Sequence, residues 1–175
     1  MFTNFKNKSY ESELYNKIVS LSRNKFFYTK FNLEDSFSNR IVLIFIHTAF
    51  LLIKLKKNYP HNKNFNQNFF DIIFTKIEIN IREIGFGDVK VNKDMKLLVK
   101  KFYEILFKCE SYGNLSYENK EIFFNTYLDK NKTNKSLDID GLGHYFTQYK
   151  AFCFDLRPDS VLKGELNFNY KQIDK

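Results

Sequence analysis

Apolar residues recur at spacings of three and four along most of the chain, which is the pattern of helices that bury one face. The pattern predicts six helices, at about residues 11–23, 36–57, 65–84, 92–112, 117–128 and 137–156. Residues 1–10 are predicted to be a flexible tail, and residues 162–170 alternate weakly, as an extended segment does. We therefore expect an all-α, single-domain helical bundle over residues 11–175, with a short extended C-terminal tail.

The second predicted helix is apolar on nearly every side between Ile41 and Leu55, so we expect it at the centre of the bundle. Its longest apolar run, Ile41 to Ile53, is 13 residues. A membrane-spanning helix needs about 20 apolar residues, so a buried core helix is the better interpretation. His47 lies inside this run, where a histidine is usually a core residue bonded to a carbonyl or a neighbouring polar group.

The third predicted helix ends in Gly85-Phe86-Gly87-Asp88. Gly85 is well placed for the left-handed conformation that closes many helices. A phosphate-binding loop is disfavoured, because this corner follows a helix and lacks both a third glycine and a lysine-serine pair. Asn92 is the predicted cap of the next helix.

The net charge of +8 indicates a partner with negative charge, such as nucleic acid, the ribosome or an anionic membrane. An AT-rich genome, which favours codons for Lys, Asn, Ile and Phe, would produce the same bias. Lys93, Lys96 and Lys100 share one face of the fourth predicted helix. That face is either an ordinary solvated surface or an electrostatic footprint for RNA or acidic headgroups.

Known chemical signatures are few. Cys109 and Cys153 have no metal-ligand spacing and lie in apolar patterns, as buried thiols of a reducing compartment do. Asp138-Ile139-Asp140-Gly141 resembles the start of a calcium loop, but Tyr149 stands where the bidentate glutamate is required, so helix capping is preferred. No nucleophile stands beside a base. The sequence therefore predicts no enzyme, no metal and no cofactor, although the many aromatic residues leave a haem or lipid pocket as a weaker hypothesis.

Several short motifs together resemble the ubiquinol–cytochrome c chaperone family. The most specific is Arg82-Glu83-Ile84-Gly85-Phe86-Gly87-Asp88. The resemblance covers nearly the whole chain, and its other parts are Arg40 seven positions before His47, Arg23-Asn24-Lys25-Phe26-Phe27-Tyr28, Val91-Asn92-Lys93, Phe102-Tyr103 and Gly164-Glu165-Leu166-Asn167-Phe168.

The resemblance implies a non-enzymatic assembly factor for the cytochrome bc1 complex that binds newly made cytochrome b. It also implies contact with the ribosome near its exit tunnel, and leaves open contact with the inner membrane; no DNA partner is expected. Because the chain begins almost directly at the family domain, we expect a bacterial member in the cytoplasm or on the cytoplasmic face of the inner membrane. The alternative is a basic helical protein that binds RNA or the ribosome.

The resemblance also suggests residue roles. Arg40, His47, Gly85 and Gly87 are expected to be structural. The predicted partner-binding residues are Arg82, Glu83, Asp88, Lys93, Lys96 and Lys100. A competing interpretation is that Arg82 and Asp88 pair with each other and hold the third and fourth helices at a fixed angle.

Overall fold

The computed structural model describes residues 3–58, 61–133 and 135–170. Within these residues the chain is helical with no strand, and Leu33 and Lys130 form an isolated β-bridge. The helices are α1 (Thr3–Ser22), α2 (Lys25–Thr29), α3 (Phe37–Asn58), α4 (Lys63–Glu83), α5 (Asp88–Glu110), the 3₁₀ helix η1 (Tyr112–Asn114), α6 (Tyr117–Tyr127), α7 (Ile139–Asp155) and α8 (Pro158–Leu162). The predicted all-α, single-domain fold is confirmed, with the short helices α2 and α8 added.

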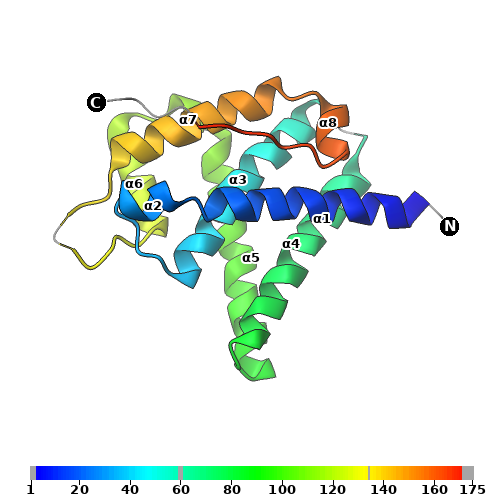
Figure 1. Cartoon of the computed structure of the whole chain (residues 1–175), viewed down its shortest axis with the longest axis horizontal. Coiled ribbons are helices and arrows are strands. Elements are labelled where there is room, and N and C mark those ends of the chain that lie inside the picture. Colours follow the sequence, from blue (N-terminus) through cyan, green and yellow to red (C-terminus); the bar gives the residue numbers. More distant parts are fainter. Residues whose placement is uncertain (1–2, 59–60, 134, 171–175) are drawn as a thin grey trace.

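Helix α3 runs through the centre of the molecule (Figure 1) and packs against α1, α4, α5 and α7. Every residue from Ile41 to Leu51 is buried, as the apolar pattern predicted. By length and composition α3 is a candidate membrane span, but 78% of its most apolar window is buried inside the protein. That burial is what a core helix requires.

The aromatic residues that follow α1 close one end of the core. The sequence predicted an irregular segment here, but Phe26 and Phe27 lie in the short helix α2. The Phe27 ring packs edge-on against Tyr145 of α7, with 4.8 Å between ring centroids. The C-terminal segment 165–170 has no regular secondary structure and places Phe168 against Tyr149, at 5.1 Å. Helix α2 and the C-terminal segment 165–170 therefore pack onto neighbouring residues of α7, Tyr145 and Tyr149.

Two helix starts differ clearly from the prediction, those of α1 and α5. Helix α1 already begins at Thr3, so most of the predicted tail is helical. Helix α5 begins at Asp88, because Gly87 is the N-cap and its carbonyl accepts a hydrogen bond from the Val91 N–H at 3.1 Å. Asn92 is therefore inside the helix and caps nothing. Pro158 follows the end of α7 and also starts α8, where a missing N–H costs nothing.

Helices α4 and α5 form a hairpin that stands out from the rest of the molecule (Figure 1), and the glycine corner is its outer end. Gly85 has a φ of +96°, and its N–H bonds to the Arg82 carbonyl at 2.9 Å. The predicted left-handed helix cap is thus confirmed. Gly87 has an ordinary φ of −71°.

The two glycines of the corner should therefore respond differently to substitution. No atom lies within 4 Å of the position of an added Cβ at either glycine. Gly85→Ala is strained by the positive φ alone and should lower the free energy of unfolding by about 1 kcal/mol. Gly87→Ser puts a favoured N-cap residue into an allowed conformation and should cost nothing. Urea unfolding of both variants checks this; equal losses would contradict it.

Candidate partner-binding site

A groove of about 280 Å³ lies between α1, α3 and α4. Its apolar surface includes the buried side chains of Ile41, Ile44 and Ile77. Arg40 from α3 and Glu83 from α4 bring opposite charges to its lining. The other lining residues are Tyr15, Val19, Ser22, Arg23, Phe37, Asn80 and Ile84. Phe37 and Ile84 are 40% and 55% exposed, so large apolar side chains also remain available at the groove.

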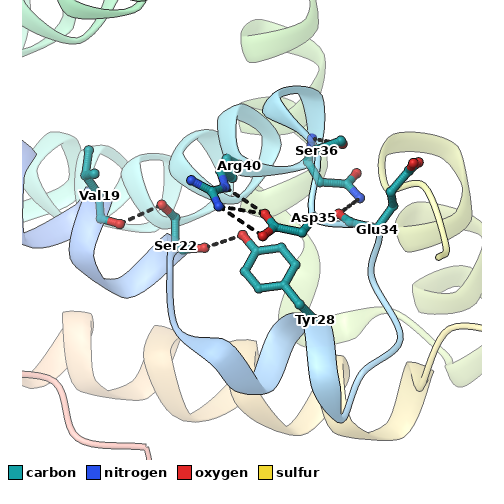
Figure 2. A network of polar contacts seen from close by, with 8 residues as sticks. Val19, Ser22, Tyr28, Glu34, Asp35, Ser36 and Arg40 are labelled. Carbon is teal, nitrogen blue, oxygen red and sulfur yellow. Dashed lines mark hydrogen bonds and ion pairs between the residues drawn. The ribbon is translucent and has the colours of Figure 1, made fainter.

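A polar network holds the Arg40 side of this groove in place (Figure 2). The Arg40 guanidinium donates to Asp35 from Nε at 2.8 Å and from Nη2 at 3.0 Å, which is the bidentate geometry of a strong ion pair. The guanidinium also lies 5.9 Å from the centre of the Tyr28 ring. Arg40 is therefore engaged in contacts within the chain, and its expected structural role stays a prediction.

Tyr28 links this network to the end of α1. Its hydroxyl donates to the Ser22 carbonyl at 2.7 Å, and the Ser22 hydroxyl donates to the Val19 carbonyl at 2.8 Å. Both carbonyls belong to the last turn of α1, and the Val19 carbonyl also accepts from the Arg23 N–H at 3.1 Å. Burial raises the pKa of Tyr28 to about 12, so the phenol stays protonated and remains a donor. The α1 wall of the groove is thereby tied to the α2 segment.

The Arg82 side chain spans the corner between α4 and α5. It donates to Glu78 from Nε at 2.9 Å and from Nη2 at 2.8 Å, and Nη1 pairs with Asp88. These hydrogen bonds raise the pKa of Arg82. The pairing of Arg82 with Asp88, one of the two interpretations of this motif, is therefore present. Since Asp88 is the first residue of α5, the pair also places a negative charge at a helix N-terminus, where it is favourable.

The predicted partner-binding residues do not form one site. Glu83 lines the groove, and Arg82 and Asp88 are engaged with each other at the corner. Lys93, Lys96 and Lys100 are exposed along α5, which contributes no lining residue to the groove. The Lys100 ammonium is 4.0 Å from Glu104, an ordinary exposed i,i+4 pair. Binding of a partner by any of these residues stays a prediction.

His47 is fully buried and joins α3 to α7. Its Nδ1 lies 2.6 Å from the Leu43 carbonyl, and its Nε2 lies 2.7 Å from the Tyr145 hydroxyl. A carbonyl only accepts, so Nδ1 carries the proton and Nε2 accepts from Tyr145. Burial lowers the pKa of His47 to about 4, so the ring is neutral near pH 7. This arrangement makes His47 a satisfied core residue, as the sequence indicated.

Sequence reasoning missed two polar residues of α3 that are also buried. The Lys54 ammonium donates to the Phe154 carbonyl in the last turn of α7, where a positive charge is favourable. Asn39 accepts from the Asp129 N–H at 2.8 Å and donates to the Asp129 carbonyl at 2.7 Å. Lys54 follows His47 by seven residues, which puts both on the same side of the helix. That spacing is the signal from which its burial could have been inferred.

The other residues that the sequence marked as chemical candidates have structural surroundings. Asp138 accepts from the Gly141 N–H at 3.0 Å and caps α7, as proposed in place of a calcium loop. Cys109 and Cys153 are buried free thiols, and burial raises the pKa of each. Among the described residues, no three His, Cys, Asp or Glu side chains lie close enough together to hold a metal ion.

Comparison with known proteins gives three matches. The family model described as "Ubiquinol-cytochrome C chaperone" matches residues 29–155. The crystal structure of the Cbp3 homolog from Brucella abortus has the same fold, with a TM-score of 0.80 at 21% identity, covering 95% of this chain and 92% of that chain. A probable DNA polymerase of Ascobolus immersus is 30% identical over 141 residues, which are 74% of this chain. The chain spans only 11% of that polymerase.

Within the described residues the chain is an all-α protein with a groove whose lining carries opposite charges. The family match covers α3 to α7, which include the Arg40 and Glu83 sides of the groove and the whole hairpin. The chain belongs to the ubiquinol–cytochrome c chaperone family.

The buried His47 predicts a specific loss of stability in acid. The pKa of about 4 in the folded state lies below the ordinary value of 6.5. As the pH falls between these values, the unfolded chain takes up a proton that the folded chain does not, so the free energy of unfolding decreases. From about pH 7 to about pH 4, wild-type protein should lose about 3 kcal/mol more than His47→Gln. Parallel losses in urea titrations of the two proteins would refute this.

Proposed function

We propose that this chain is a non-enzymatic assembly factor for the cytochrome bc1 complex, and that its groove holds an apolar segment of newly made cytochrome b. The observation that carries the proposal is the groove itself, in a member of the ubiquinol–cytochrome c chaperone family. A newly made membrane protein exposes apolar side chains that need cover until they are packed or inserted. Phe37 and Ile84, which are 40% and 55% exposed, supply an apolar surface of that kind.

The size and charge of the groove favour a polypeptide client. Its volume of about 280 Å³ is below the ~300–1,000 Å³ typical of small-molecule and cofactor sites. It therefore suits a few side chains of a longer segment better than a haem. Arg40 and Glu83, placed on different helices, give the groove charges of both signs with which to orient polar groups of the segment.

We further propose that the protein works in the cytoplasm, at the cytoplasmic face of the inner membrane, and that the ribosome is a second partner. The exposed lysines of α5 support an electrostatic contact of this kind. They also support the alternative, a protein whose function is RNA binding alone. In that case RNA affinity falls steeply with salt, and charge reversal at Lys93, Lys96 and Lys100 abolishes it.

Deletion of the gene in its native host tests the assembly role. The mature bc1 complex should fall in amount while transcripts of its subunits remain unchanged, because the loss acts after synthesis. Membrane spectra of b-type and c-type haem, together with native gels, provide the measurement. Normal levels of the bc1 complex in the deletion strain would rule out the proposal.

Substitution of exposed groove residues tests the site. Phe37→Ala combined with Ile84→Ala removes apolar surface without opening the core, and should weaken capture of cytochrome b by about tenfold or more. The double change Tyr117→Ala and Ile122→Ala is the matched control, since both α6 residues are 57% exposed and lie outside the groove. Co-purification of cytochrome b with tagged protein is measured in detergent, with melting temperature recorded alongside. Equal capture by the groove and control variants would show that the client binds elsewhere.

A further inference from the structure

The outward side of α5 carries large apolar side chains that nothing in the described structure covers. Val89 is 86% exposed, Leu97 is 57% exposed and Phe107 is 72% exposed. The opposite side of the helix is in the core through Val91 and Phe102. An amphipathic helix of a globular protein normally has only one apolar side. On α5, whose first half belongs to the projecting hairpin (Figure 1), three exposed apolar side chains also lie on the side away from the core, interspersed with lysines.

Two of the exposed apolar residues, Val89 and Phe107, share one face with the lysines, and Leu97 lies at the edge of that face, about 80° around the helix. Val89 and Phe107 are 18 residues apart, which is five complete helical turns, so they point in the same direction. The lysines lie between them along the helix and within about 40° of the same direction around it. We call this surface the outer face of α5 and define it as Val89, Lys93, Lys96, Leu97, Lys100 and Phe107.

The charges on the outer face are nearly all positive. Two carboxylates flank this side: Glu104 lies 4.0 Å from Lys100, and Glu110 lies 3.7 Å from Lys56 of α3. Lys93 and Lys96 make no ion pair within the described part of the chain. The neighbouring carboxylates Asp88 and Asp94 are engaged with Arg82 and Lys90. The outer face therefore offers two lysines free to meet an external negative charge.

We propose that the outer face of α5 binds the surface of an anionic lipid bilayer. Val89, Leu97 and Phe107 enter the boundary between headgroups and acyl chains, as the apolar side of an interfacial helix does. The long stems of the lysines let their ammonium groups reach the anionic headgroups at the same time.

The arrangement fits a bilayer better than a macromolecular partner. Charged residues are depleted from the centre of protein–protein interfaces, whereas here the lysines lie in the middle of the face. RNA would use the lysines but would leave Val89 and Leu97 exposed to water. A bilayer uses both kinds of side chain, because its charged and apolar layers adjoin.

This proposal rests on the proposed location at the membrane, and it assigns the membrane contact to the outer face of α5. The groove is lined by α1, α3 and α4, so lipid on α5 does not occupy it. The test below uses purified chain and lipid alone. If the chain does not bind lipid, the proposed binding of cytochrome b in the groove is unaffected. If the groove variants capture cytochrome b as well as the control does, the proposed lipid surface is unaffected.

The absence of tryptophan from the chain allows a direct measurement of insertion. Leu97→Trp places one tryptophan on the outer face, and Ile122→Trp places one at an equally exposed site on α6, both residues being 57% exposed. Vesicles of phosphatidylcholine with phosphatidylglycerol should shift the Leu97→Trp emission to the blue, and brominated acyl chains should quench it. The Ile122→Trp emission should remain that of a residue in water.

Vesicle flotation with further variants separates the two parts of the surface. Lys93→Glu with Lys96→Glu, and separately Val89→Ser with Phe107→Ser, should each lower binding to anionic vesicles by on the order of tenfold or more. Lys163→Glu, an exposed lysine on the end of α8, should not. Pure phosphatidylcholine vesicles should bind weakly.

Three results would overturn the proposal. The first is a Leu97→Trp spectrum that remains unchanged with the vesicles that contain phosphatidylglycerol. The second is undiminished binding of the Val89→Ser, Phe107→Ser variant to anionic vesicles, since binding would then depend on charge attraction alone. The third is equal loss of binding in Lys163→Glu, since this would place the effect in the net charge of the chain. Circular dichroism of each variant confirms that the fold is intact.

Discussion

Helix α3 is enclosed along eleven consecutive residues, Ile41 to Leu51, so no polar group in that stretch can rely on water. A buried polar group without a partner is costly, and a buried charge is more so. His47 meets this constraint through Tyr145, and Lys54, one turn beyond the enclosed stretch, meets it through the carbonyl of Phe154. Both partners belong to α7. These two hydrogen bonds add specific polar contacts to the packing of α7 against α3, whereas the buried Thr48 hydroxyl has no hydrogen-bond partner within the described residues.

At the start of α3, the buried side chain of Asn39 also needs hydrogen-bond partners, and it finds them in a loop rather than in a helix. Asn39 is buried and exchanges hydrogen bonds with the backbone of Asp129, so the segment after α6 is held against the beginning of α3. One residue further, Arg40 turns outward and pairs with Asp35. The groove opens beside Arg40, where α1 and α4 cover α3 only in part. The same helix thus supplies the most enclosed region of the molecule and the floor of its candidate site.

Local signals in the sequence predicted much of the fold and little of the site. Apolar periodicity gave the main helices, and Gly85 was recognised because a left-handed residue at a helix end has few alternatives to glycine. The start of α5 was placed too late, since Asn92 is a good cap in isolation whereas Gly87 owes its capping role to the hairpin corner. Arg40 and Glu83, 43 positions apart, line the same groove because of how α3 and α4 pack, which no local pattern encodes.

The hairpin gives the two proposed surfaces a fixed relation to each other. Helix α4 contributes Ile77 and Glu83 to the groove, while α5 presents its outer face away from the core. The corner between them is shaped by the left-handed Gly85 and by Arg82, which pairs with Glu78 and Asp88 at once. A segment bound in the groove is then held at a set orientation to any bilayer that α5 touches. The proposed client must finally lie inside that bilayer. A fixed angle between the groove and the outer face of α5 would limit the positions from which the bound segment can be released into it.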